Sequence, residues 1–236
     1  GMGGQAVEPF VCAGEVDTDW NLIVQILSAF VQAGAITLLV SAGAVLVGVV
    51  LGFWLNVVQD TWLPFRRFYS LFVWFFRGTP FLIQLFVLYY GFPQIGITFS
   101  PIEATVIGLG IYSSAYFAEI FRASWQGIPA GQVEAARVFG LDRWQTLRHV
   151  QLPQALRLAL PLMTNQFILV LKESSVASII TVPELTMRAG TVVAETFSYV
   201  EPYLLLGLIY WVIALALSRL GLLAEARMSA HLVAKV

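Results

Sequence analysis

The 236-residue sequence contains one cysteine, Cys12, two histidines, and few charged side chains, which make up 11% of the chain. A lone cysteine excludes an internal disulfide framework and a cysteine-rich metal site. The chain also lacks a GxxxxGK[ST] segment, the common backbone cradle for nucleotide phosphates. Because 13 basic residues nearly balance 14 acidic ones, nothing draws the whole chain electrostatically to nucleic acid.

Long apolar runs without any charge fill most of the sequence, at 22–58, 78–102 and 202–218. About 20 helical residues cross a hydrocarbon core about 30 Å thick. The sequence therefore predicts an all-α polytopic membrane protein with five transmembrane helices, at about 33–55, 68–92, 104–121, 156–181 and 202–217. A sixth span, obtained by splitting 22–58 into a hairpin, would need a polar turn that this run lacks.

The apolar runs divide the chain into one large unit and two tails. We expect an N-terminal tail over 1–20, a single transmembrane domain over 21–224 and a C-terminal tail over 225–236. Basic residues are concentrated on one predicted side of the membrane. Ten lie there and only Arg188 lies opposite; the ten are Arg66, Arg67, Arg122, Arg137, Arg143, Arg148, Arg157, Arg219, Arg227 and Lys235. Since basic loops stay in the cytoplasm, we expect an outside N-terminus and a cytoplasmic C-terminus.

A polar segment over 122–155 interrupts the oily spans on that cytoplasmic side. Val133–Phe139 is predicted to form a short helix that ends at Gly140, because glycine tolerates the left-handed conformation. Asp142 is a suitable cap for a second short helix, and Pro153 suits the first turn of the next one. Such a segment is consistent with an amphipathic helix lying on the headgroups or with an element that docks on a soluble partner.

The spacing within this segment resembles the EAA loop of ABC-importer permeases. Glu134-Ala135-Ala136 precedes Gly140 by three residues, and Leu152-Pro153 closes the pattern, with Val150 where the family has Ile. FRGTPFLIQLF at 76–86 and AYFAEIFRASWQGIPAGQVEAA at 115–136 are similar to the polar-amino-acid subgroup. The resemblance runs from about residue 30 to the C-terminus and implies the type I ABC importer permease fold in a bacterial inner membrane.

The same resemblance implies partners and a division of labour. The two short helices would be coupling helices that seat in a cleft of a cytoplasmic ATP-binding cassette subunit. Two such subunits, a second permease chain (identical or paralogous) and an extracytoplasmic solute-binding protein would complete the assembly. This chain would bind no cofactor and have no ATPase site of its own, since ATP and Mg would lie on the partner. The residues implied in coupling are Glu134, Ala135, Ala136, Gly140, Leu152 and Pro153.

Polar residues within the predicted fourth span indicate a substrate path. Asn165 and Lys172 lie seven residues apart, as do Gln166 and Glu173, so each pair shares a helix face. Charges within a bilayer tend to face a bundle interior or a water-filled cavity, and a zwitterionic amino acid needs both signs of charge. The alternative is an ion pair that fixes packing between helices or chains. The predicted path residues are Asn165, Gln166, Lys172, Glu173, Ser174 and Ser175.

The second and third spans contain a further set of polar residues that we assign to the path or to its gating: Arg77, Thr79, Pro80, Gln84, Tyr116 and Glu119. Each has a structural alternative. Arg77 could bond backbone carbonyls freed where Pro80 breaks the helix, and Glu119 could form an intrahelical pair with Arg122.

Three functions fit these observations to different degrees. The first is the membrane subunit of an ATP-driven importer for polar amino acids. The second is an ion-coupled carrier or channel working alone, which would leave the EAA-like segment without a role and lacks the paired broken helices of many carriers. The third is a membrane scaffold or intramembrane enzyme, for which no catalytic constellation is present. No metal site is expected from His149 or His231.

Overall fold

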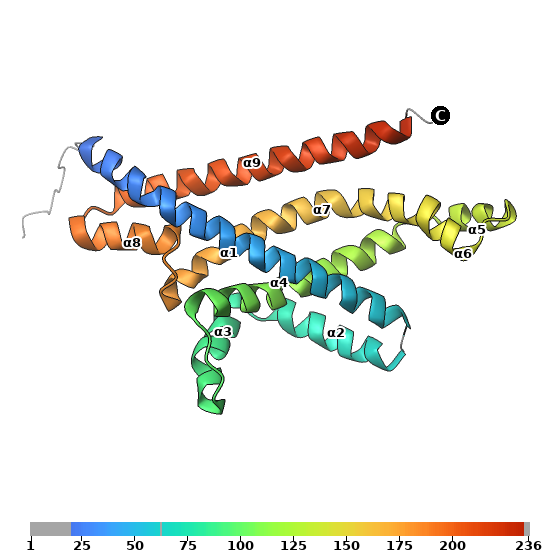
Figure 1. Ribbon diagram of the computed structural model, residues 1–236, viewed down its shortest axis with the longest axis horizontal. Coiled ribbons are helices and arrows are strands. Elements are labelled where there is room, and N and C mark those ends of the chain that lie inside the picture. The colour runs from blue at the N-terminus through green and yellow to red at the C-terminus, as the bar shows by residue number, and fades with distance from the viewer. Residues whose placement is uncertain (1–19, 62, 234–236) are drawn as a thin grey trace, which may run out of the picture.

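A computed structural model describes residues 20–61 and 63–233 of the chain (Figure 1). The predicted N-terminal tail with Cys12, apart from residue 20, lies outside these residues, as do Lys235 and the side chain of His231. The described chain forms helices in this order: α1 (Trp20–Thr61), α2 (Leu63–Gly78), α3 (Phe81–Phe86), a π-helical turn η1 (Val87–Gly91), a 3₁₀ turn η2 (Phe92–Ile95), α4 (Pro101–Gln126), α5 (Ala130–Val138), α6 (Arg143–Thr146), a π-helical turn η3 (Leu147–Gln151), α7 (Leu152–Glu173), a 3₁₀ helix η4 (Ser174–Ile180), α8 (Leu185–Thr196) and α9 (Val200–Val233).

The described helices supply up to five membrane crossings. Within the described residues, four stretches are long and apolar enough to cross a bilayer, and α2 with α3–η2 forms a fifth, bent by 103° at the break after Gly78. The four are Phe30–Gln59, Pro101–Gln126, Arg143–Ile180 and Val200–Met228. The all-α membrane fold is therefore as predicted for the described residues, and the five expected spans are found when the bent pair is counted as one span. The expected second span contains a sharp corner, where its RGTP sequence lies.

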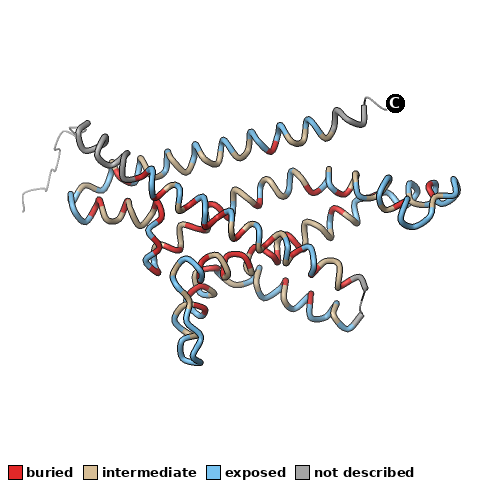
Figure 2. The backbone as a smooth tube through the Cα atoms, in the orientation of Figure 1, coloured by how far each residue is buried: buried red, intermediate tan, exposed pale blue. Residues whose placement is uncertain are grey.

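Close packing of α1 against α4 forms the centre of the molecule, and glycines make it possible. A Cβ added at Gly48 or Gly52 would lie within about 3 Å of α4, against Ser113 in the first case and the Ser114 carbonyl and Phe117 in the second. Gly48 and Gly52 form a GxxxG pair, which lets membrane helices approach closely. The buried residues accordingly concentrate where α1, α4, α7 and η4 meet, while α9 is mostly exposed or half-buried (Figure 2).

A buried carboxylate joins α8 and α9 at one end of the bundle. Glu184 is 1% exposed, and its oxygens accept the backbone N–H groups of Thr186 and Met187, which caps α8. Tyr210 of α9 donates to the same side chain at 3.1 Å, and the Leu185 N–H donates to Thr37 of α1. This joint holds α8 at the end where α1 begins, opposite the end that carries α5 and α6 (Figure 1).

The segment between α4 and α7 has the local structure predicted for it. Gly140 adopts a φ of 80° and ends the first short helix. Asp142 caps the second through a reciprocal pair of hydrogen bonds with Gln145, and Pro153 lies in the first turn of α7. Helix α5 with α6 projects beyond the bundle at the end where α9 terminates (Figure 1). The segment between α4 and α7 and the C-terminal end of α9 are therefore on the same side of the molecule.

Candidate functional site

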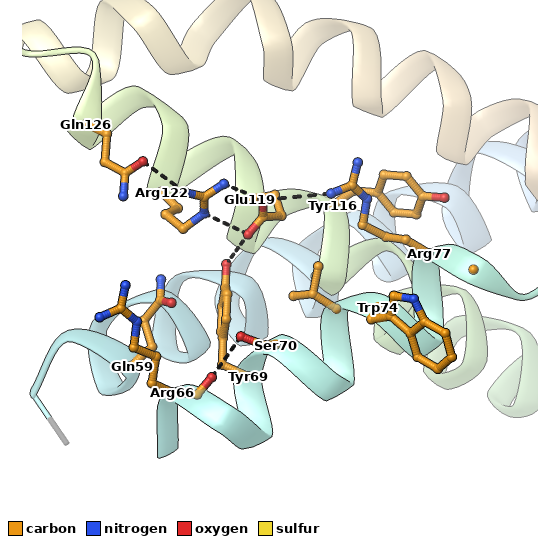
Figure 3. A pocket seen from close by; sticks show the side chains of 12 residues that line it. Gln59, Arg66, Tyr69, Ser70, Trp74, Arg77, Tyr116, Glu119, Arg122 and Gln126 are labelled. Atoms are coloured by element: carbon orange, nitrogen blue, oxygen red, sulfur yellow. Dashed lines mark hydrogen bonds and ion pairs between the residues drawn. The ribbon is translucent and has the colours of Figure 1, made fainter. Parts of the chain in front are cut away.

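A polar network between α2 and α4 centres on the Glu119 carboxylate (Figure 3). Arg122 donates to both of its oxygens at 2.8 and 2.7 Å, as expected for residues three apart on a helix. Tyr69 of α2, only 3% exposed, donates its hydroxyl to Glu119 at 2.7 Å. Arg77 approaches the same carboxylate no closer than 3.8 Å, and its guanidinium lies over the Tyr116 ring, 5.2 Å from the centroid.

Two cavities meet at this network. One, of about 650 Å³, runs along the faces of α2 and α4 and includes Arg66, Arg77 and Arg122. The other, of about 410 Å³, lies between α4 and α7 and is lined by Asn165 and Gln166. Arg77, Tyr116 and Glu119 line both. The smaller cavity has the size of a small-molecule site, so these three residues separate such a site from a larger polar one.

The corner between α2 and α3 is stabilised by Gln84. Its Nε2 donates to the Thr79 hydroxyl at 2.7 Å and to the carbonyls of Thr79 and Phe76. Thr79 in turn bonds the Phe75 carbonyl. Pro80 has no N–H to continue the helix, and Gln84 occupies the carbonyls that the break leaves. Gln84, and not Arg77, therefore bonds the backbone carbonyls that the break at Pro80 leaves free. Arg77 is available for another partner.

The residues predicted to line the path in the fourth span lie on α7 and η4, and they differ in how far they are buried. Asn165 and Lys172 are exposed on the surface of the single chain, and Glu173 and Ser175 are half-buried. Gln166 and Ser174 are buried, and Ser174 bonds the Leu171 carbonyl. Neither Lys172 nor Glu173 forms an ion pair with any described residue; the ion pairs of this part of the chain are those of Glu119. A packing ion pair within the chain is thus absent from the described residues.

A pair of tyrosines lies beside Arg77. The hydroxyls of Tyr112 and Tyr116 lie 3.2 Å apart, and the Arg77 guanidinium stacks on Tyr116. Arg77, Tyr116 and Gln166 line the same cavity, so the structure brings together predicted residues from the second, third and fourth spans.

The segment between α4 and α7, called the coupling segment below after the role predicted for it, presents large apolar side chains to solvent. Val138 is 86% exposed, Phe139 84% and Trp144 67%, beside a cavity lined by Arg137, Asp142 and Arg143. Of the residues assigned to coupling, Glu134, Ala135, Gly140 and Leu152 are exposed, while Ala136 is buried and Pro153 half-buried. An exposed apolar cluster on a polar segment is typical of a protein-binding surface.

Three important residues were not found by sequence reasoning. Tyr69 lies 50 positions from Glu119 in a stretch with six other aromatic residues between 65 and 76, so nothing marked it. Val138 and Phe139 were predicted only as the end of a short helix. Their position immediately before Gly140, at the tip of the segment, was the only available signal that they are exposed.

Comparisons with known proteins place this geometry in a family. Residues 44–230 match the family described as binding-protein-dependent transport system inner membrane component. The probable amino-acid ABC transporter permease protein YckA of Bacillus subtilis (strain 168) is 43% identical over 178 residues, which cover 75% of this chain and 79% of the relative. The arginine transport system permease protein ArtQ of the same organism is 31% identical over 92% of this chain and all of the relative.

Solved structures agree with the sequence relatives. A crystal structure of an amino acid ABC transporter with histidines superposes with a TM-score of 0.83 and 37% identity, over 89% of this chain and 98% of that chain. An inward-facing structure of the MetNI methionine ABC transporter gives a TM-score of 0.63 at 17% identity over 89% of this chain. The second likeness supports the type I importer fold alone.

Proposed function

Because the chain belongs to the family of binding-protein-dependent transport system inner membrane components, we propose that it is the permease through which a polar amino acid is imported. The amino-acid ABC transporter permeases among its relatives support this cargo class. Partner ATPase and binding-protein subunits are implied by the family. In our proposal two ATP-binding cassette subunits carry the ATP and Mg, and this chain has no ATPase site of its own.

The observation that carries this proposal is the exposed apolar tip of the coupling segment. Burying Val138, Phe139 and Trp144 would return about 1.5–3 kcal/mol for each fully covered side chain, and a helix-in-groove contact is the common way to do so. Gly140 fixes the angle between α5 and α6, and exposed Glu134 offers an anion to a basic group on the ATPase. We therefore assign this surface, with Ala135, Ala136, Leu152 and Pro153 as its frame, to ATPase coupling.

The second permease chain in our proposal covers the exposed face of α7. Asn165, Leu169 and Lys172 are exposed there in the single chain. A lysine in a span is costly against lipid and is usually placed toward protein or a water-filled cavity. A second copy or paralogue facing this stripe would enclose a path that Gln166, Glu173, Ser174 and Ser175 extend. Arg77, Tyr116 and Glu119 would gate it, on the α2 arm that Thr79, Pro80 and Gln84 hold bent.

In this arrangement the coupling segment lies in the cytoplasm, along with the C-terminus. The N-terminus and α8 lie outside, where the solute-binding protein delivers the amino acid. The ten basic residues that the sequence assigns to the cytoplasmic side support this orientation through the positive-inside rule.

The coupling surface is tested by Phe139→Asp, with Phe197→Asp as the matched control. Both phenylalanines are more than 80% exposed, but Phe197 follows α8 at the opposite end of the molecule. We expect Phe139→Asp to abolish copurification of the ATPase from native membranes and Phe197→Asp to leave it intact. Both variants should insert in the membrane at wild-type amounts.

Retention of the ATPase by Phe139→Asp, together with uptake at the wild-type rate, would contradict the docking assignment. Loss in both variants would also contradict it, since an effect shared by the two ends would come from folding rather than from docking.

A further inference from the structure

Arg77 is the guanidinium that lines the cavity between α4 and α7, and its exposed side chain forms no hydrogen bond to the described chain. Its side chain is 45% exposed, its nearest carboxylate oxygen is 3.8 Å away, and Tyr116 covers one face of its plane. By contrast, Arg122 donates three hydrogen bonds, two to Glu119 and one to Gln126. Arg77 is therefore held in place by stacking and by charge, with its donors unfilled.

Glu119 does not depend on Arg77 for its neutralisation. Its two oxygens already accept two bonds from Arg122 and one from Tyr69, at 2.7–2.8 Å. The longer Arg77 contact is the weakest of the four by distance. If another carboxylate took Arg77, Glu119 would keep its short contacts and would not be left as an unpaired charge. Exchange of partners at Arg77 thus costs little on the protein side.

A guanidinium with unfilled donors beside a cavity is suited to a planar carboxylate. Arginine binds carboxylates through two parallel N–H···O bonds, which are about twice as strong as neutral hydrogen bonds. The cavity between α4 and α7, about 410 Å³, is large enough for an amino acid and borders Arg77 directly. A carboxylate entering it from the α7 side would meet Arg77 with Asn165 and Gln166 opposite.

Lys172, which the sequence analysis assigned to the substrate path, lies away from Arg77 and the two cavities. It is exposed and is not among the residues that line the two cavities. Glu173 is likewise absent from the residues that line these two cavities.

We propose that Arg77 receives the α-carboxylate of the transported amino acid, while Glu119, 3.8 Å from the guanidinium, stays bonded to Arg122 and Tyr69. This assignment rests on the amino-acid cargo proposed above. It makes Arg77 a binding residue, with Tyr116 positioning the guanidinium and Tyr69 and Arg122 retaining Glu119.

The test measures equilibrium binding to the purified permease–ATPase complex without the binding protein, so that the affinity reported is that of the membrane site. Radiolabelled L-arginine, L-glutamine and L-cystine serve as probes, each compared with its α-carboxamide. For the best-bound amino acid we expect Arg77→Gln to weaken binding by about tenfold or more, the effect of losing a charged hydrogen-bond pair. Affinity for the carboxamide, which lacks the negative charge, should be weak in the wild type and nearly unchanged by the substitution.

Matched variants separate this effect from charge and folding. Arg67→Gln removes an arginine from the same helix at an exposed position outside both cavities and should not alter affinity. Arg77→Lys keeps the charge facing Glu119 but loses the planar fork, so it should fold normally and bind with intermediate affinity. Lys172→Gln should retain the preference for the amino acid over its carboxamide.

Unchanged affinity in Arg77→Gln, or an equal loss for the amino acid and its carboxamide, would overturn the assignment while leaving the proposed importer function standing. Loss of the carboxylate preference in Lys172→Gln alone would return the role to Lys172. If the wild-type complex bound none of the three amino acids, the proposed cargo class would fail, and this inference with it.

Discussion

Glu119 is the residue on which the α2–α4 contact depends, because groups from both helices converge on its carboxylate. Its strongest partners are Arg122 on its own helix and Tyr69 on α2. A carboxylate within a membrane protein is tolerated where such donors satisfy it. The Tyr69 hydroxyl is thus the direct polar link that holds α2 to α4 beside Arg77.

At the same scale, Tyr69→Phe removes this hydroxyl and leaves the ring in its apolar surroundings. We expect the free energy of unfolding to fall by about 1.5–3 kcal/mol, the usual worth of a hydrogen bond to a charged group. Thermal unfolding of the detergent-solubilised protein measures the loss. Ser70→Ala is the control, since Ser70 is exposed and bonds only the Arg66 carbonyl one turn earlier. Equal stability of the two variants would show that Tyr69 contributes through its ring alone.

Among the elements, the α5–α6 pair depends on one backbone conformation. Gly140 has a φ of 80°, and nothing lies within 4 Å of where its Cβ would be. A side chain there would be strained by the backbone and not by contacts, at a cost of about 1–2 kcal/mol. Relief of that strain would change the angle between the two short helices.

We therefore expect Gly140→Ala to reduce substrate-stimulated ATP hydrolysis by the assembled complex severalfold while membrane insertion stays normal. Gly96→Ala provides the control, because Gly96 has a φ of 84° and equally open surroundings but lies beyond the bent α3 arm. It should incur the same backbone cost without loss of coupling. ATPase assays of both variants decide this, and a similar loss in both would mean that coupling does not depend on the α5–α6 angle.

Elements governed by local chemistry were predictable from the sequence, and contacts between distant elements were not. The Gly140 turn, the Asp142 cap and the position of Pro153 are each determined locally, by residues no more than about four positions away in the sequence. The apolar runs marked the spans because the bilayer imposes their length. Pro80 predicted a break in the helix here. The angle of 103° also depends on the hydrogen bond from Gln84 to the Phe76 carbonyl, which the sequence did not predict. Nothing in the pattern linked Tyr69 to Glu119, and Lys172 could not be recognised as lying away from the cavities.

On the scale of the whole molecule, the two proposed sites occupy separate regions. Helices α5 and α6 project beyond one end of the bundle (Figure 1), whereas the residues that line the two cavities come mainly from α2, α4 and α7. Long, tightly packed helices connect them, since α4 leads directly into the coupling segment and α7 leads out of it. A movement imposed on α5 and α6 would thus be transmitted to both helices that line the smaller cavity.

The central claim is that a separate ATPase docked at α5–α6 drives amino-acid import through this chain. The most direct measurement is uptake of radiolabelled amino acid into proteoliposomes containing the assembled complex, with binding protein outside and ATP inside. The account predicts uptake that requires both the ATPase and internal ATP, and that is abolished by Phe139→Asp. Uptake by this chain alone, driven by an imposed proton or sodium gradient and indifferent to ATP, would contradict it.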